Sequence, residues 1–168
     1  MGNSVKMRFR IGFGNDIHRL VAGRPLILGG VLIPSDIGAA GHSDADALMH
    51  AITDAILGAL ALGDIGTHFP DSDQKLKNAD SSIFLKETLK MMKSRNYQIE
   101  NVDAIVSLEK PKLKPYIEKI RKNLAEILEV ELDRVSVKAK TGEGLDAIGK
   151  GDAIKAEAIV LLTEKPNQ

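Results

Sequence analysis

The stretch SDADALMHAITDAILGALAL, residues 43–62, is the longest helix candidate in this chain. Its apolar side chains recur at helical spacing, so that one face carries Leu48, Ile52, Ala55, Ile56 and Ala59. Ser43 can cap the start of this helix, and Asp44 and Asp46 suit the positive end of the helix dipole. The stretch therefore predicts a helix that packs one apolar face on the rest of the fold.

Strand-like segments lie on both sides of this helix in the sequence. MRFRIGFG (7–14) alternates as a strand does, and PLILGGVLIP (25–34) predicts two short strands that meet at a Gly-Gly turn. Three later segments have the β-branched alternation of strands: NVDAIVSLE (101–109), DRVSVKAK (133–140) and AIKAEAIVLLTE (153–164). Two further amphipathic helices are predicted at SSIFLKETLKMMKS (81–94) and PYIEKIRKNLAEILEV (115–130).

The order of these segments indicates the fold class. Several strands keep polar residues at alternate positions, so one sheet face is expected to be wet or paired with another subunit. This pattern favours an α+β fold, a two-layer sandwich of a mixed β-sheet with helices on one face, over a doubly wound sheet. We expect a single catalytic domain over residues 1–168, with residues 1–6 as a disordered extension.

Composition excludes several classes of function. Lys+Arg and Asp+Glu both number 23, so no net charge points to a nucleic acid or an anionic membrane as partner. The chain has no cysteine, which excludes disulfides, thiolate metal sites and a cysteine nucleophile. MGNSVKMRFR lacks the apolar region of a secretory signal, and no stretch is long and apolar enough to span a bilayer. These features predict a soluble, cytoplasmic protein.

A metal site is suggested by GFGNDIHR, residues 12–19, where the first predicted strand ends. Asp16 and His18 are two residues apart, so on an extended chain their side chains point to the same side. His50 lies about two turns into the long helix, with Asp46 and Asp54 four residues away on either side. These two carboxylates could fix the tautomer of His50, as the outer partners of metal-binding histidines do.

Asp16, His18 and His50 together would form a set of two histidines and one carboxylate with one open position, which is typical of catalytic zinc. The local spacing supports equally well the alternative that His50 is an ordinary surface residue among carboxylates.

His42 precedes the helix in GHSD, where Ser43 and free backbone N–H groups can bind an anion. An ordinary loop histidine is an equal alternative there, and His68 shows no such geometry. GLDAIGKG (144–151) matches part of a P-loop, but Gly151 stands where a P-loop needs serine or threonine. The segment after it is a predicted strand, so this is no nucleotide triphosphatase motif.

Four segments together resemble the 2-C-methyl-D-erythritol 2,4-cyclodiphosphate synthase family of the non-mevalonate isoprenoid pathway. They are DIH (16–18), GHSDADALMHAITDAILGALALGDIGTHFPDSD (41–73), NVDAIV (101–106) and VKAKTGEGL (137–145). The resemblance runs from about Met7 to Leu162. It implies a homotrimer of α+β subunits whose sheets face the threefold axis, with active sites between subunits.

The resemblance also implies the reaction and its cofactors. The substrate is 4-diphosphocytidyl-2-C-methyl-D-erythritol 2-phosphate, a cytidine diphosphate derivative. Its 2-phosphate attacks the β-phosphorus, closes a ring and expels CMP. Asp16, His18 and His50 would hold one zinc ion per subunit, and Glu143 would hold a magnesium or manganese ion.

Substrate contacts follow from the same resemblance. His42 and Ser43 would contact the phosphates, and His42 with Thr141 would stabilise the transition state. The methylerythritol site would comprise Asp64, Ile65, Gly66, Phe69, Pro70, Asp71, Ser72 and Asp73. The cytosine site would comprise Leu108, Glu109, Lys110, Pro111, Lys112, Leu113 and Lys114, together with Ala139, Lys140 and Thr141.

Two lysines depart from the family pattern. Lys140 stands where many members have threonine, and Lys150 replaces the arginine of a common GRGEG motif. Both are counted as substrate-binding candidates.

Two other functions use the same residues. A zinc-dependent phosphoester hydrolase would activate a water and would need a general base, for which Asp54 or Asp64 is available. A non-catalytic nucleotide-binding module would use zinc structurally, but structural zinc usually has four protein ligands and the sequence offers three.

Overall fold

The structure, a computed structural model, describes residues 8–70 and 72–165. Its main sheet has five strands in the order β4-β1-β7-β5-β6. The five are β1 (Phe9–Ala22), β4 (Ile37–Ala39), β5 (Tyr97–Ser107), β6 (Val135–Lys140) and β7 (Ala153–Glu164). β5 and β6 are parallel, whereas β1 is antiparallel to β4 and β7, and β7 is antiparallel to β5. The sheet is therefore mixed, as predicted.

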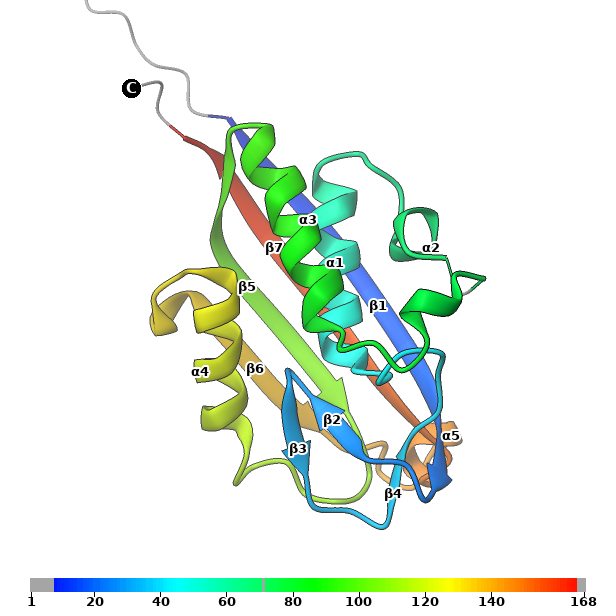
Figure 1. Cartoon of the computed structure of the whole chain (residues 1–168). Coiled ribbons are helices and arrows are strands. Elements are labelled where there is room, and N and C mark those ends of the chain that lie inside the picture. The colour runs from blue at the N-terminus through cyan, green and yellow to red at the C-terminus, as the bar shows by residue number, and fades with distance from the viewer. Residues whose placement is uncertain (1–7, 71, 166–168) are drawn as a thin grey trace, which may run out of the picture.

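Helices cover one face of this sheet (Figure 1). They are α1 (Ala47–Ala59), α3 (Ser82–Ser94) and α4 (Ile117–Leu128). β2 (Leu26–Leu28) and β3 (Val31–Ile33) form the predicted hairpin. Short helical turns complete the chain: α2 (Ile65–His68), η1 (Gln74–Leu76), η2 (Leu132–Arg134) and α5 (Asp146–Gly149). The predicted extension at residues 1–6 lies outside the described residues.

β1 is longer than its sequence pattern predicted. It pairs with β7 without interruption from Phe9 opposite Thr163 to Arg19 opposite Ala153. The prediction that the strand ends before Asp16 was therefore wrong, because pairing with β7 extends it. Asp16 and His18 lie inside this strand and still share one face of the sheet.

α1 packs on β1 through two glycines. A Cβ atom at Gly12 would lie 1.7 Å from the carbonyl oxygen of Ala55, and one at Gly14 would lie 2.1 Å from that of Ala51. No other residue permits so close an approach of a helix backbone to a strand. This contact lets α1 pack directly on β1, and Figure 1 shows the helix running along this strand.

The long helix is buried more completely than one apolar face requires. All five predicted apolar residues are buried, and so are Ala47, Met49, Ala51, Thr53 and Leu57. The partly exposed positions His50, Asp54 and Gly58 follow one another at i, i+4 spacing. Of these three, His50 lines the candidate site.

The start of α1 also differs from the prediction. Asp46, not Ser43, is the N-cap residue, and its side chain accepts a hydrogen bond from the backbone N–H of Met49. Asp44 precedes the helix and bonds elsewhere.

Within residues 8–70 and 72–165, every helix is too short or too polar to cross a membrane.

Candidate active site

Three side chains from two elements converge on one point. Asp16 and His18 project from β1, and His50 projects from α1. Asp16 Oδ2 lies 2.8 Å from His18 Nε2 and 2.9 Å from His50 Nδ1, and the two ring nitrogens are 3.4 Å apart. Ligands of a tetrahedral zinc ion at about 2.0–2.1 Å are about 3.3 Å from one another. The two histidine nitrogens have this separation, and the two contacts to Asp16, now at hydrogen-bond length, would lengthen by about 0.4–0.5 Å around a zinc ion.

Hydrogen bonds on the far side of His18 orient it toward this point. His18 Nδ1 lies 2.9 Å from the carbonyl oxygen of Ala40, which directly follows β4. A carbonyl oxygen only accepts, so Nδ1 must carry the hydrogen. The remaining nitrogen, Nε2, is then available as a metal ligand, in the arrangement common among metal-binding histidines.

The charges of the cluster are strongly coupled. Burial raises the pKa of Asp16, but the hydrogen bonds and charge interactions with His18 and His50 together outweigh burial and hold that pKa well below its usual value. Burial lowers the pKa of His18, but its hydrogen bond and charge interaction with Asp16 outweigh burial and raise the pKa above 6.5. Without a metal, a proton therefore takes the place of the cation between these groups.

The two carboxylates expected to fix the His50 tautomer do not contact it by hydrogen bonds. Asp46 is buried and accepts from the backbone N–H groups of Gly29, Gly30 and Met49. Asp54 accepts from the backbone N–H of Ile65, and burial raises the pKa of its carboxyl. That prediction was wrong because both carboxylates bond to backbone N–H groups instead of to the His50 ring.

Serine hydroxyls occupy the far side of His50 instead. His50 Nε2 lies 2.8 Å from Ser81 Oγ and 3.3 Å from Ser43 Oγ. Ser81 was not predicted, because in the sequence it is only a polar residue at the start of a helix.

A cavity of about 550 Å³ opens beside the three side chains. Its wall includes seven of the predicted substrate-binding positions: His42, Ser43, Ile65, Gly66, Phe69, Pro70 and Ser72. Leu76 and Phe84 also line it, and neither was predicted. Leu76 belongs to η1 and Phe84 to α3, and only the fold turns them toward the cavity.

Other predicted residues of this region have different surroundings. The Asp64 carboxylate caps α2 by accepting from the backbone N–H and the hydroxyl of Thr67, and these hydrogen bonds lower its pKa. His42 Nε2 lies 3.2 Å from the carbonyl oxygen of Asp73. Asp71 lies outside the described residues.

A second cavity, of about 430 Å³, lies beyond the ends of β5 and β6. Because these strands are parallel, the segments that follow them meet at the same edge of the sheet. Its lining residues are Leu108, Lys112, Leu113, Lys114, Ala139, Lys140, Thr141 and Glu143, all of them predicted site residues. The Thr141 hydroxyl donates a hydrogen bond to Glu143.

Four predicted residues do not line that cavity. Glu109 accepts from the backbone N–H of Gly142 and so fixes the loop beside the cavity. Lys110 and Pro111 belong to the same loop without lining it. Lys150 is exposed at the C-cap of α5.

The two cavities share no lining residue. β7 and β5 separate β1 from β6 in the sheet. At 4.7–4.9 Å between neighbouring strands, three steps amount to about 14 Å. Within one chain, the metal-binding cluster and Glu143 therefore belong to separate hollows.

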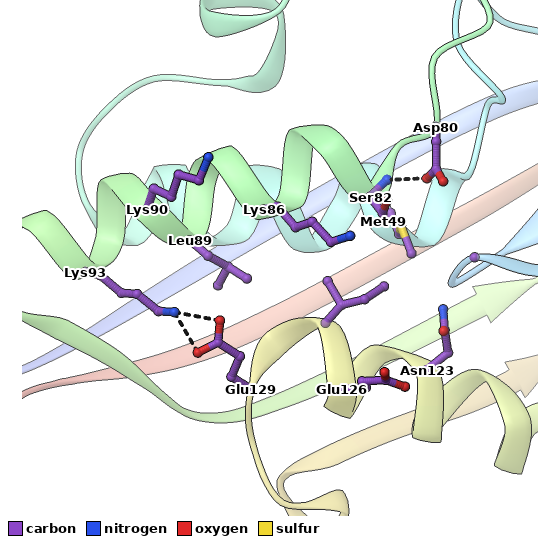
Figure 2. Close-up of a pocket in the computed structure, with 12 residues that line it drawn as sticks. Met49, Asp80, Ser82, Lys86, Leu89, Lys90, Lys93, Asn123, Glu126 and Glu129 are labelled. Atoms are coloured by element: carbon purple, nitrogen blue, oxygen red, sulfur yellow. Dashed lines mark hydrogen bonds and ion pairs between the residues drawn. The ribbon is translucent and has the colours of Figure 1, made fainter.

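A groove of about 620 Å³ lies between α3 and α4 (Figure 2). Lys86, Lys90 and Lys93 border it on α3, and Glu126 of α4 and Glu129, the C-cap of that helix, border it on the other side. Lys93 and Glu129 form an ion pair across it at 2.7 Å. No residue of the metal-binding cluster lines this groove, so it is a different feature from the candidate active site.

Comparison with known proteins gives concordant matches. The profile of the YgbB family matches residues 9–163. A protein of Fusobacterium nucleatum named 2-C-methyl-D-erythritol 2,4-cyclodiphosphate synthase is 54% identical over 156 residues, which cover 93% of this chain and 98% of that protein.

Solved structures agree with this result. A 2C-methyl-D-erythritol-2,4-cyclodiphosphate synthase in a form with bound CDP is 43% identical, with a TM-score of 0.85 over 91% of this chain and 99% of its own. A CDP complex of the Plasmodium falciparum protein called IspF is 39% identical, with a TM-score of 0.83 over 94% of this chain and 97% of its own.

Proposed function

Since the chain belongs to the YgbB family, we propose that it converts 4-diphosphocytidyl-2-C-methyl-D-erythritol 2-phosphate into 2-C-methyl-D-erythritol 2,4-cyclodiphosphate and CMP. The observation that carries this proposal is the convergence of Asp16, His18 and His50 beside a cavity that also contains His42 and Ser43. Two histidines and one carboxylate with room for a further ligand suit a zinc ion that meets the substrate.

Two places in the chain suit cations. Asp16, His18 and His50 would hold zinc, one ion per subunit, and Glu143 would hold magnesium or manganese. Ions bound at these places supply positive charge that neutralises the diphosphate and polarises the phosphorus under attack.

The protein's own side chains bind and orient the substrate. Ser43 and His42 border the cavity beside the cluster, where they can contact phosphate oxygens. Lys112, Lys114 and Lys140 line the second cavity and give it positive charge for the CMP half of the substrate. The Thr141 hydroxyl donates to Glu143 in this structure; with a cation on Glu143 in its place, that hydrogen would be released to donate to a phosphate oxygen in the transition state.

The reaction requires positioning more than acid–base catalysis. An oxygen of the 2-phosphate forms a bond to the β-phosphorus, and the bond from that phosphorus to the bridging oxygen breaks. CMP leaves with the electron pair of that bond. The attacking phosphate is already anionic, so no general base is needed. Both reacting groups belong to one molecule, and holding them in line supplies most of the remaining rate.

The proposal includes a homotrimer whose sheets face a threefold axis. Gly12 and Gly14 face α1, so the intervening side chains of β1 point to the other face of the sheet. Large apolar residues of β1 and β7 are at least 50% exposed: Phe9, Ile11, Phe13, Ile17 and Ile159. An apolar strip of this kind is typical of a subunit interface.

The separation of the two cavities supports the same assembly. If the cluster of one subunit faced Glu143 of the next, each boundary would unite the two halves of a site. This is a heterologous contact that closes into a ring of three.

The proposed reaction is tested by incubating the protein with the substrate, zinc and magnesium in water enriched in oxygen-18, followed by phosphorus NMR. We expect CMP and a cyclic diphosphate, neither of them with oxygen from the solvent. A product that carries labelled oxygen would contradict the proposal and favour the zinc-dependent phosphoester hydrolase.

A further inference from the structure

We propose that Ser81 and Asp44 act as positioning residues that determine which nitrogen of His50 faces the metal. This inference rests on the proposed metal site but assigns a role to two residues outside the predicted ligand set. Ser81 is completely buried, and its hydroxyl lies between His50 Nε2, at 2.8 Å, and the carboxylate of Asp44.

The hydroxyl of Ser81 is not engaged in the usual role of a serine at its position. Ser81 is the N-cap of α3, where a serine side chain commonly accepts from the first backbone N–H groups. Here it makes no capping bond. Its hydrogen bonds connect α3 to α1 and to the loop before α1 instead, so the helix does not depend on this hydroxyl for its cap.

Asp44 sets the direction of the hydrogen bonds. One carboxylate oxygen accepts from the backbone N–H of Ser81 at 3.1 Å, and the other accepts from the Ser81 hydroxyl. An ionised carboxylate only accepts, so the hydroxyl hydrogen points toward Asp44. The Ser81 oxygen then presents a lone pair to His50, and His50 Nε2 must donate to it.

The consequence appears at the other side of the ring. With the hydrogen on Nε2, His50 Nδ1 carries a lone pair, and it lies 2.9 Å from Asp16 Oδ2. In neutral His18 the lone pair is likewise on Nε2, because His18 Nδ1 donates to Ala40. When both histidines are neutral, three lone pairs therefore converge, and a cation between them relieves their repulsion: a proton in the metal-free protein, or a metal ion in its place. The relay from Asp44 through Ser81 therefore prepares the site for a metal.

Ser43 is the weaker partner of the same nitrogen. Its oxygen is 3.3 Å from His50 Nε2 and also accepts from the backbone N–H of Ala45 at 3.1 Å. The shorter contact to Ser81, reinforced by the charge of Asp44, should dominate.

The chain provides a matched control in the next residue. Ser82 lines the groove between α3 and α4, and Figure 2 shows its backbone bonded to the Asp80 carboxylate. Ser81→Ala and Ser82→Ala remove the same hydroxyl from adjacent positions at the start of one helix. Only the first removes a partner of His50.

The test measures zinc affinity by competition with a chelator in the wild type and both variants. Loss of an outer partner of a metal ligand typically lowers metal affinity about 10–100-fold. We expect that loss for Ser81→Ala and an affinity within about twofold of wild type for Ser82→Ala. Equal affinities in all three proteins would overturn the role of Ser81. A wild type that binds no zinc would instead refute the proposed function.

A second readout separates positioning from a structural effect. In the zinc-loaded wild type, nitrogen-15 NMR of the histidine rings should show a slowly exchanging hydrogen on His50 Nε2, and Ser81→Ala should speed its exchange. The wild-type spectrum alone already tests the proposal, because it shows which nitrogen of His50 carries the hydrogen. Zinc bound through His50 Nε2, with the hydrogen on Nδ1, would overturn the proposal in the wild type itself.

Discussion

Replacing Gly14 with alanine should push α1 away from β1 and thereby weaken both the fold and the metal site. The new Cβ would lie 2.1 Å from the oxygen of Ala51, 2.6 Å from the backbone nitrogen of Ala55 and 2.9 Å from the Cβ of Asp54. None of these atoms can rotate away, because two belong to the backbone of the helix and the third is attached directly to it. The helix must move by about 1 Å to restore ordinary contact distances.

The size of the effect follows from this displacement. Overpacking a well-packed core costs about 1–3 kcal/mol, and contact with rigid atoms places Gly14→Ala near the upper end. At about 2–4 °C per kcal/mol for a chain of this size, the melting temperature should fall by about 6–12 °C. The same movement lengthens the distances from His50 on α1 to Asp16 and His18 on β1, so zinc affinity should fall as well.

Gly58→Ala is the matched control, because it makes the same substitution in α1 itself. A Cβ at Gly58 would meet only the oxygen of Phe13, at 3.8 Å, which is ordinary contact. Alanine favours a helix over glycine by about 1 kcal/mol, so this variant should be slightly more stable and bind zinc normally. Melting followed by circular dichroism and zinc competition measure both effects. A Gly14→Ala protein that melts and binds zinc like Gly58→Ala would refute the close-packing argument.

Three further predictions concern metals, protons and assembly. Glu143→Gln should weaken magnesium activation and leave zinc in place; an unchanged magnesium dependence would exclude Glu143 as the ligand. In the metal-free protein, the ion pair of Asp16 with His18 stabilises the fold. This stabilisation is complete below about pH 6.5, the pKa of histidine in the unfolded chain. It is lost as the pH rises through the raised pKa of His18 in the folded protein. Zinc needs neutral His18, so zinc affinity should rise over the same pH interval. At successive pH values, the melting temperature of the metal-free protein should fall while the zinc affinity from chelator competition rises. Finally, inactive His50→Ala and Glu143→Ala chains refolded together should regain activity at about a quarter of their subunit boundaries. Preformed trimers of the two variants that are mixed briefly should stay inactive. Mixed trimers without activity would place the whole site in one chain.

Local periodicity was enough to predict most elements of this fold. Strands alternate in polarity, and the helix has apolar residues at helical spacing from Leu48 to Ala59, because each buries one face. This pattern can be recognised within each segment alone. The end of β1 could not be predicted in this way, because pairing with β7 extends it past Asp16. The burial of α1 on nearly all sides also depends on α3, which is distant in the sequence.

The candidate site, like the fold, was predictable from the sequence only in part. The i, i+2 spacing of Asp16 and His18 predicted their convergence, and the structure confirms that His50 joins them. The partners of His50 were missed because they depend on how two helices meet. Asp46 is four residues away in sequence but serves as a cap, whereas Ser81 is 31 residues away and contacts the ring.

The most direct test of the account compares His50→Ala with His68→Ala for zinc content and release of CMP. His68 bonds to the backbone oxygen of Leu62 and lies outside the metal-binding cluster. We expect about one zinc per chain and CMP release for the wild type and His68→Ala, and loss of both in a folded His50→Ala protein. Full zinc occupancy with undiminished CMP release in His50→Ala would contradict it.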